Sequence, residues 1–447
     1  MGEFKYLVID TETSLKNKGE ESVGNFKASP FHPNNEIVML GELSDTDDRV
    51  SILTKEDMSK LDLSMASPAL DEIANQEVML VGQNIGFDML YLYKFDSKVR
   101  EKYRHALIWD TMIVEYLLTG QRKMFCSLDE LALKYYGATE EEIQWYLKRK
   151  SNEAAAQIAG TTEAFDLDMT AFLRKWHGVL KDDKIKEYWN AGMETEDIPE
   201  DELKEYLIGD VRNTKHVFLA QFDLAYKLGM LPLIRTQMDA RLATIEMEWN
   251  GMFVNKSTLK SDGSGLLLDI NILKSTLNAS IMGHCKFPVG AIFDVSCTSP
   301  KVISAVLFGG LLPYKIKEPM LDDDDKPVLY KSGPHKGLAR FKTATKLHEV
   351  KPGIPGRPEA VGSVQGALGQ WSTGESVLKK IADKYKIEFV EDLLKLRTMD
   401  KDYTAFYKST EELIWHDGCV HPTYNHTATA TGRLSCSKPN LQQVSSS

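Results

Sequence analysis

Residues 4–13 read FKYLVIDTET, and this stretch determines how the chain begins to fold. Residues 4–10 of this stretch form a short apolar run rich in β-forming residues, which predicts a strand. Because side chains alternate across a strand, Asp10 and Glu12 point to one face and bring two carboxylates together at a sheet edge. Two such charges repel each other unless cations neutralise them. Taken alone, the pattern fits a cation site and a solvated turn equally well.

The segments that follow predict an α/β domain. Residues 36–43 and 78–82 have the composition of strands, and residues 89–95 have that of a helix. Residues 68–76 also predict a helix, with Ser67 as its N-cap and Pro68 at its first position. The order strand, helix, strand, helix indicates a mixed sheet with helices on it.

A second acidic element lies in residues 83–88, QNIGFD, which follow an apolar strand and open a helix. Asp88 is expected to turn back toward the edge that carries the first pair, while Phe87 packs inward. In the alternative reading, Asn84 and Asp88 only cap the helix.

A third acidic element is residues 206–210, YLIGD, whose four-residue spacing places Tyr206 and Asp210 on one helix face. This spacing alone is common by chance. Together the three elements supply four carboxylates, Asp10, Glu12, Asp88 and Asp210. Hard oxygen ligands of this kind suit two Mg²⁺ or Mn²⁺ ions about 3.5–4 Å apart, which can hydrolyse a phosphodiester. One ion would activate water and the other would stabilise the leaving 3′ oxygen.

The segments VIDTET, NIGFD and YLIGD resemble, in this order, the three motifs of DnaQ-like 3′→5′ exonucleases of the DEDDy subclass. The resemblance implies a ribonuclease H-like fold. It further implies that Asp10, Glu12, Asp88 and Asp210 bind the metal ions, that Tyr206 orients the attacking water, and that Asn84 and Phe87 contact the single-stranded 3′ end of DNA. Residues 126–137, CSLDELALKYYG, resemble a helix of these nucleases, and Asp110 ahead of them is expected to be structural.

The most distinctive segment is residues 427–444, TATATGRLSCSKPNLQQV. Arg433 is a fixed cation among small hydroxyl residues, which suits phosphate binding, and Asn440 and Gln442 carry amides that can read minor-groove acceptors. A Ser/Thr-rich loop with one arginine also arises by chance.

This segment closely resembles the opening of the palm in family A, or DNA polymerase I-like, enzymes. Upstream, residues 248–251, 299–301, 372–375 and 394–397 resemble successive elements of the thumb. The resemblance implies contacts with a primer–template duplex by Arg397, Thr431, Arg433, Ser435, Asn440 and Gln442.

We therefore expect three parts: an exonuclease domain over residues 1–228 with a helical insertion at about 140–200, a thumb-like helical region over 229–415, and the start of a palm over 416–447. Helices are expected at 203–228, 234–249 and 257–281, and again between Trp371 and Trp415 with Ser372 or Thr373 as an N-cap. The fold class is thus α/β followed by a mostly helical thumb and a partial palm.

Residues 310–369 predict an irregular or hairpin-like insertion with a local basic excess. Its cations are Lys315, Lys317, Lys331, Lys336, Arg340, Lys342, Lys346 and Lys351. They suit a clamp on duplex DNA or a dock for a processivity factor; a solvated connector is the alternative.

Composition limits the remaining possibilities. The 447 residues carry 54 Lys plus Arg against 65 Asp plus Glu, a net charge of -11, so DNA contact must come from local basic surfaces. The five cysteines form no CxxC pair and read as free thiols. With neither a leader nor an apolar run of about 18 residues, we expect a soluble cytoplasmic protein, in the host cytoplasm if viral.

In family A enzymes, the two metal-binding aspartates of polymerisation and the fingers helix follow the PNLQ segment, and this sequence stops at Ser447. We therefore expect no polymerisation by this chain alone. A second polypeptide that supplies palm and fingers and a truncated sequence both remain open. The lack of a 5′-nuclease region favours a phage-type enzyme. Two alternatives stand beside proofreading: a separate exonuclease acting on RNA or repair intermediates, and a non-catalytic DNA-binding subunit of a split polymerase.

Overall fold

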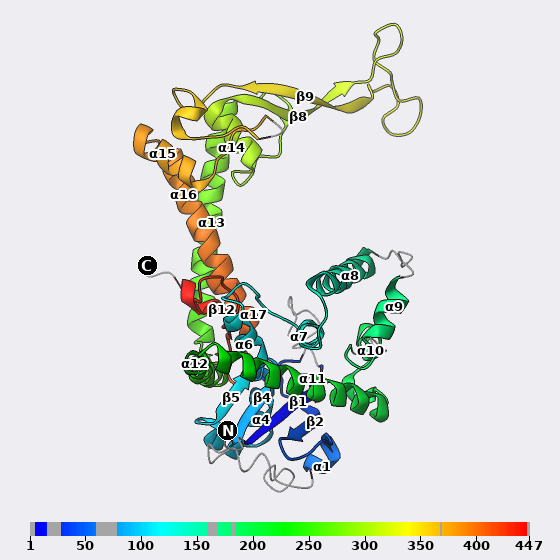
Figure 1. The fold of residues 1–447 in the computed structure, drawn as a ribbon. Helices are drawn as coiled ribbons and strands as arrows, with labels where there is room; N and C mark the ends of the chain where they lie inside the picture. The colour runs from blue at the N-terminus through cyan, green and yellow to red at the C-terminus, as the bar shows by residue number, and fades with distance from the viewer. Residues whose placement is uncertain are drawn as a thin grey trace. The chain divides into compact units, whose positions relative to one another are not determined.

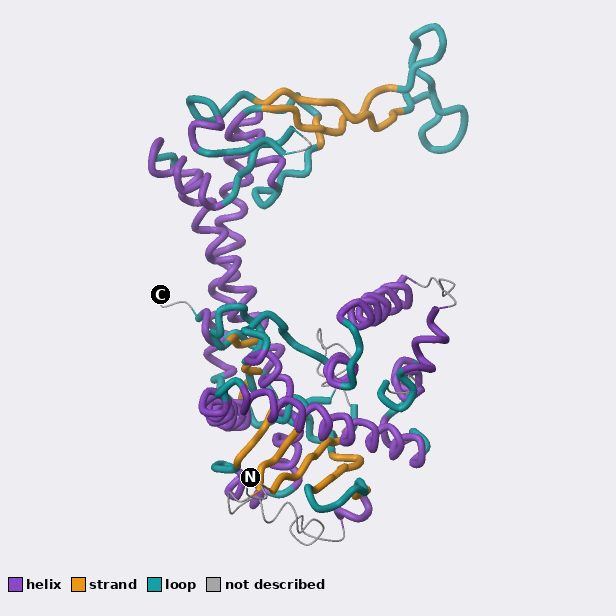
Figure 2. The backbone as a smooth tube through the Cα atoms, viewed as in Figure 1, coloured by secondary structure: helices purple, strands orange, loops and turns teal. Residues whose placement is uncertain are grey.

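The computed structural model describes residues 5–15, 28–59, 78–159, 168–180, 184–366 and 369–444. It divides into two compact units, the first made of Met1–Asn255 with Glu412–Ser447 and the second of Lys256–Glu411 (Figures 1 and 2). The helix predicted at residues 68–76, with its cap at Ser67, lies outside the described residues. In the part of the chain that is described, none of the helices is long and apolar enough to cross a membrane.

A five-stranded sheet with the order β3-β2-β1-β4-β5 forms the centre of the first unit. Its strands are β1 (Lys5–Thr13), β2 (Ile37–Ser44), β3 (Ser51–Thr54), β4 (Val78–Gly82) and β5 (Leu107–Asp110). β2 is antiparallel to β1 and β3, whereas β4 is parallel to β1 and β5. The mixed α/β organisation predicted from the sequence is confirmed, and β1 continues beyond the predicted end at residue 10.

Seven helices pack against this sheet or against one another in the described part of the first unit. They are α1 (Lys55–Ser59), α4 (Gly86–Phe95), α5 (Ser97–Tyr103), α6 (Thr111–Leu118), α7 (Leu128–Tyr135), α11 (Glu200–Lys227) and α12 (Leu231–Asn250). α11 rests directly on β2, because a Cβ built on Gly41 would lie 2.8 Å from Cγ2 of Val211 and 2.9 Å from Cγ of Leu207. The absence of a side chain at Gly41 therefore sets how closely α11 approaches the sheet.

The predicted helical insertion is present. It contains α8 (Glu140–Ala159), α9 (Asp168–Lys175), α10 (Lys184–Asn190) and the short turn η2 (Thr195–Asp197). Ile143, Tyr146, Phe172 and Trp176 form a small buried cluster with Leu133 of α7. The insertion thus has a core of its own next to the sheet.

The C-terminal segment belongs to the first unit. β10 (Cys419–Val420) pairs with β6 (Met252–Phe253), and β11 (Thr423–Asn425) pairs with β12 (Ser435–Ser437), which η5 (Leu441–Gln443) follows. α12 also packs in this unit, because Ile234, Met238 and Ile245 are buried in its core. The compact unit therefore extends to Asn255, past the boundary predicted near residue 228.

A buried ion pair on α12 anchors the C-terminal segment. Arg241 Nη1 lies 3.1 Å from Glu248 Oε1, and both side chains are almost fully buried. The same Glu248 oxygen accepts a hydrogen bond from the backbone N–H of Tyr424 at 2.8 Å. Thr244 Oγ1 lies 2.9 Å from Nε2 of His426. β11 is thus tied to α12 by charged and polar side chains.

This anchor predicts a loss of stability in mild acid. Burial, together with the nearby Arg241, lowers the pKa of His426 from 6.5 to about 4. Between these values the unfolded chain binds a proton that the folded protein excludes, so the free energy of unfolding falls as the pH drops from 6.5 toward 4. Between pH 7 and pH 5 we expect a loss of ~2 kcal/mol from this group.

Urea unfolding at the two pH values measures the effect. The His426→Gln variant, which does not titrate, provides the control and should lose less stability between them. An identical loss in both proteins would contradict the assignment.

The second unit is built around α13 (Lys256–Cys285) and α16 (Glu388–Asp402). With them lie α14 (Pro300–Phe308), η3 (Pro358–Val361), α15 (Glu375–Tyr385), the π-helical turn η4 (Tyr403–Lys408) and the start of α17 (Ser409–Leu413). Ile270, Leu277, Leu378 and Leu393 are among its buried core residues. The predicted N-cap at Ser372 or Thr373 is wrong, because α15 is preceded by Gly374 as its N-cap residue, without a side-chain cap.

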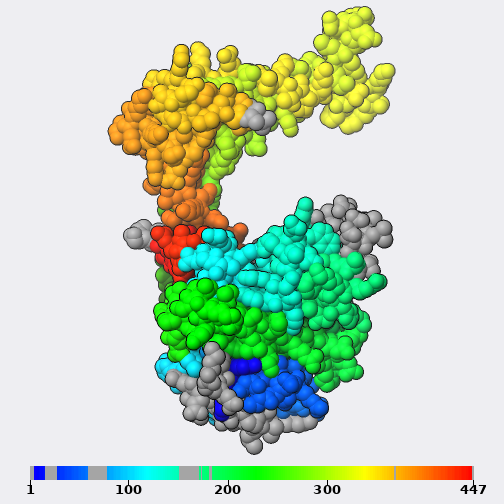
Figure 3. Space-filling model, viewed as in Figure 1, coloured from blue at the N-terminus to red at the C-terminus, as the bar shows by residue number. Residues whose placement is uncertain are grey.

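A long hairpin extends from this second unit. β8 (Gly310–Pro319) and β9 (Phe341–Val350) pair antiparallel along their whole length, and β7 (Ala291–Ile292) joins β8. The hairpin-like insertion predicted from the sequence is therefore present, and its far end projects away from the helices of its unit (Figure 3). Its basic side chains are exposed along the arm. A role in binding duplex DNA or a processivity factor stays a prediction.

Candidate active site

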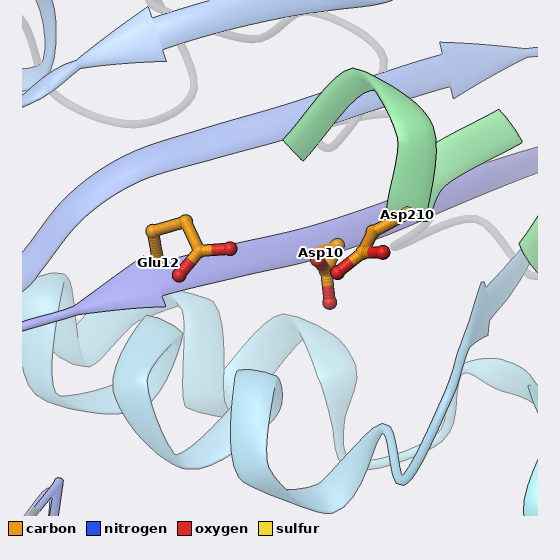
Figure 4. Close-up of side chains that lie close together, drawn as sticks. All are labelled: Asp10, Glu12 and Asp210. Atoms are coloured by element: carbon orange, nitrogen blue, oxygen red, sulfur yellow. The ribbon is translucent and has the colours of Figure 1, made fainter. Parts of the chain in front are cut away.

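Three of the predicted carboxylates meet on one face of the sheet. One oxygen each from Asp10, Glu12 and Asp210 lies within 4.8 Å of the others, and Figure 4 shows β1 carrying the first two while α11 brings Asp210 over them. Glu12 is 7% exposed and Asp210 4%. β-strand alternation puts Asp10 and Glu12 on one face, and the contact of α11 with Gly41, which pairs with Asp10, brings the third carboxylate to the same place.

Asp88 is not one of the three grouped carboxylates and is bound instead to Thr11. Its Oδ1 accepts hydrogen bonds from the backbone N–H of Thr11 at 3.0 Å and from the Thr11 hydroxyl at 2.6 Å. Thr11 lies between Asp10 and Glu12, so Asp88 is fixed to the strand that carries the pair. Burial raises the pKa of Asp88 to about 7, although the two hydrogen bonds from Thr11 oppose this rise.

Tyr206 lies on α11, one helical turn before Asp210. Its ring packs edge-on against Trp189 of the helical insertion, with the ring centroids 5.9 Å apart. The side chain is half-buried. The structure thus places Tyr206 on the cluster-bearing helix and supports its ring with an aromatic residue that the sequence reasoning did not identify.

The loop before α4 contains the predicted site residue Asn84, and Phe87 follows it in the first turn of the helix. Asn84 has a positive φ of 55° and an exposed side chain, and the N-cap position of α4 is Ile85, without a side-chain cap. The alternative that Asn84 caps the helix is therefore wrong. Phe87 is half-buried, with its ring centroid 5.1 Å from that of Tyr91.

Asp110 itself is fully buried at the start of α6. Its carboxylate accepts hydrogen bonds from the backbone N–H groups of Met112 and Ile113, which caps α6, and from those of Asn84 and Ile85. This geometry agrees with the structural role expected from the sequence.

The predicted duplex contacts fall into two places. Thr431, Arg433, Asn440 and Gln442 are exposed around the β11–β12 hairpin, and Ser435 is half-buried in β12. The hydroxyl of Thr429 donates to the carbonyl oxygen of Arg433 at 2.8 Å and closes the turn before β12. Arg397 lies in the second unit, where its Nη1 donates to the carbonyl oxygen of Thr373 at 2.7 Å and burial lowers the pKa of its guanidinium.

The sequence reasoning missed Thr11 and Arg241. A signal for Arg241 was present, because it occupies a core position between the buried Met238 and Ile245 of an otherwise amphipathic helix. A charged residue at a core position indicates a buried partner, which here is Glu248. Thr11 gave no signal, because its partner Asp88 lies 77 residues away in the sequence.

Comparisons with known proteins point to DNA polymerases. Residues 359–447 match the model of DNA polymerase family A. DNA polymerase I of Treponema pallidum is 40% identical over 74 residues, which are 17% of this chain and 7% of that protein. The thermostable DNA polymerase I of Thermus aquaticus is 37% identical over 86 residues, or 19% and 10%. The DNA polymerase of Bacillus phage SP01 is 37% identical over 75 residues, or 17% and 8%. The chain thus spans a small part of the length of these relatives.

A solved structure of similar fold can be superposed over the whole chain. It is described as the POL domain of Pol1 from M. smegmatis in complex with DNA primer-template and dNTP, and it matches with a TM-score of 0.54 at 15% identity. The match covers 100% of this chain and 53% of that one. The fold therefore resembles that of a polymerase domain. Residues 359–447 form, more particularly, a region related to family A DNA polymerases.

Proposed function

We propose that the first unit is a 3′→5′ exonuclease that hydrolyses the terminal phosphodiester of DNA and releases a deoxynucleoside monophosphate. The cluster of Asp10, Glu12 and Asp210 carries this proposal. Three carboxylates that offer oxygens within 4.8 Å of one another, two of them almost fully buried, repel strongly unless cations lie between them. Carboxylate oxygens are the ligands that Mg²⁺ and Mn²⁺ prefer, so the donor set fits divalent metal ions.

Each residue of the site has a role in this reaction. Asp10, Glu12, Asp88 and Asp210 would hold two divalent ions, which would supply an activated water and stabilise the leaving 3′ oxygen. Tyr206 orients the attacking water from its position one turn before Asp210. Thr11 fixes Asp88 to β1 through its N–H and its hydroxyl. Asn84 and Phe87, at the start of α4, contact the single-stranded 3′ end.

The polymerase-related region supports a proofreading role within a family A replicative polymerase. Residues 359–447 match the family A DNA polymerase model, the curated relatives of the chain are DNA polymerases, and the structurally similar POL domain was solved with a DNA primer-template. We therefore propose that a frayed primer end enters the exonuclease site while the rest of the duplex stays bound. The duplex contacts come from Arg397, Thr431, Arg433, Ser435, Asn440 and Gln442.

Digestion of a 5′-labelled single-stranded DNA oligonucleotide tests the activity. With Mg²⁺ we expect a ladder that shortens from the 3′ end and yields deoxynucleoside monophosphate, and chelation by EDTA should stop it. An RNA oligonucleotide of the same sequence runs in parallel. Digestion of RNA but not DNA would favour a separate ribonuclease, and digestion of neither would favour a non-catalytic DNA-binding subunit.

Arg433→Ala should weaken duplex binding equally for all DNA sequences. The exposed guanidinium suits a phosphate contact, and one lost contact lowers the slope of log affinity against log salt concentration by ~0.9. Fluorescence anisotropy of a labelled primer–template at several salt concentrations measures this slope. Arg235→Ala is the matched control, because Arg235 is ion-paired with Asp239 on α12. An unchanged slope in Arg433→Ala would remove Arg433 from the duplex contacts.

A further inference from the structure

The buried carboxylate of Asp110 accepts hydrogen bonds from the loop that leads into α4. Asp110 Oδ1 accepts the N–H of Asn84 at 3.2 Å, and Oδ2 accepts the N–H of Ile85 at 3.1 Å. Asp88 lies on α4 directly after this loop, and Thr11 holds its carboxylate from the other side. The Asp110 side chain is fully buried and does not reach solvent. A shift of the loop therefore moves the start of the helix that carries Asp88.

Arg241 of α12 lies against the same loop. A Cβ built on Gly86 would fall 1.7 Å from Nη2 of Arg241, so the guanidinium occupies the space that a side chain would take. Burial raises the pKa of Asp110, and the positive charge of Arg241 opposes this rise. Arg241 is itself only 5% exposed. The cation is thus buried between the loop and its own helix.

The other side of Arg241 is fixed by the C-terminal segment. Its Nη1 binds Oε1 of Glu248 at 3.1 Å, and that oxygen also accepts the N–H of Tyr424 at 2.8 Å. Glu248 is 3% exposed, so the pair has no water to replace a lost partner. Glu248 is the only carboxylate that is paired with Arg241 in the described part of the chain. Movement of β11 away from Glu248 would therefore alter the position of the carboxylate that holds Arg241.

We propose that Arg241 is a positioning residue for the exonuclease site, and that the docking of β11 on Glu248 sets its position. The contacts run from Tyr424 to Glu248, then to Arg241, and from Arg241 to Gly86 at the start of α4. Gly86 directly follows Asn84 and Ile85, the two loop residues that Asp110 holds. In this way the polymerase-related segment controls the loop that leads into α4 and Asp88. The catalytic part of this inference rests on the proposed exonuclease function, whereas the structural coupling does not.

Two substitutions disrupt the coupling between β11 and the loop before α4 without leaving a cavity at the buried ion pair. Arg241→Lys keeps a cation for Glu248 but lacks the planar guanidinium that also packs against Gly86. Glu248→Gln keeps an oxygen that accepts from Tyr424 but removes the charge that holds Arg241. Arg235→Lys, on the exposed side of the same helix, is the matched control.

Hydrogen exchange followed by mass spectrometry is the first readout. Peptides that cover Asn84 and Ile85 should exchange about tenfold faster in both variants, as expected when hydrogen bonds to a charged acceptor weaken. Peptides of α7, over Leu128–Tyr135, should exchange as in the unsubstituted chain. Steady-state digestion of single-stranded DNA with Mg²⁺ is the second readout, where kcat should fall about tenfold at constant KM.

The two readouts test the structural coupling and the proposed exonuclease function separately. Unchanged exchange at Asn84 and Ile85, or equal acceleration at those amides and in α7, overturns the coupling and leaves Arg241 with a structural role only. Faster exchange at the loop with unchanged kcat overturns the positioning role. If the unsubstituted chain digests no DNA, the proposed function fails, while the exchange comparison still decides whether β11 controls the loop.

Discussion

Replacing Asp10 with alanine is expected to reduce Mg²⁺-dependent digestion of a DNA 3′ end by at least ~10³-fold, the order of magnitude for losing a group that stabilises developing charge. Asp10 shares the cluster with Glu12 and Asp210, and its removal leaves too few carboxylates to hold the ions that the reaction needs. The substitution also relieves repulsion between buried charges, so the folded protein should be at least as stable as before. A time course with labelled DNA and a thermal melt measure both effects.

Asp48→Ala is the matched control for this prediction. Asp48 is an exposed carboxylate just beyond β2 and is not part of the cluster. Its removal should leave digestion and duplex binding unchanged. Equal digestion rates for Asp10→Ala and the unsubstituted chain would show that the cluster is not the active site.

The second large effect is expected from Gly41→Val. Any side chain at Gly41 meets Val211 and Leu207 of α11 at distances below 3.0 Å, so the helix must move away from the sheet. Overpacking of this kind costs ~1–3 kcal/mol of stability. Because α11 carries Asp210 and Tyr206, displacement of the helix should also separate Asp210 from Asp10 and abolish digestion. Urea unfolding and the digestion assay measure the two losses.

Gly209→Ala provides the contrast on the same helix. A Cβ built on Gly209 meets no atom within 4 Å, and alanine favours a helix over glycine by ~1 kcal/mol. We therefore expect a gain in stability of that order, with α11 still in place on the sheet. Full digestion by Gly41→Val would show that the packing of α11 on β2 does not position Asp210.

The sequence predicted those parts of the fold that depend on local patterning. Strand β4 has the predicted ends, and helices α11 and α12 begin and end within a few residues of the predicted positions. The meeting of Asp10 and Glu12 followed from the period of a strand. In each case, neighbouring residues alone determine the structure.

What the sequence did not predict depends on contacts between distant segments. The anchoring of Asp88 by Thr11, 77 positions earlier in the chain, was not predicted. The position of α12 in the first unit depends on how its apolar side chains pack against α4 and β5, which periodicity does not reveal. The N-cap of α15 fell on Gly374, although Ser372 and Thr373 are the better capping residues by type.

The most direct test of proofreading compares two primer–templates that differ only in the last primer base. One carries a matched 3′ end and the other a mismatched end, both labelled at the 5′ end and incubated with the protein and Mg²⁺. Because a mismatched end unpairs at lower cost, we predict that it is shortened at least ~10-fold faster than the matched end. A mismatched primer that the protein binds but leaves at full length would contradict the account.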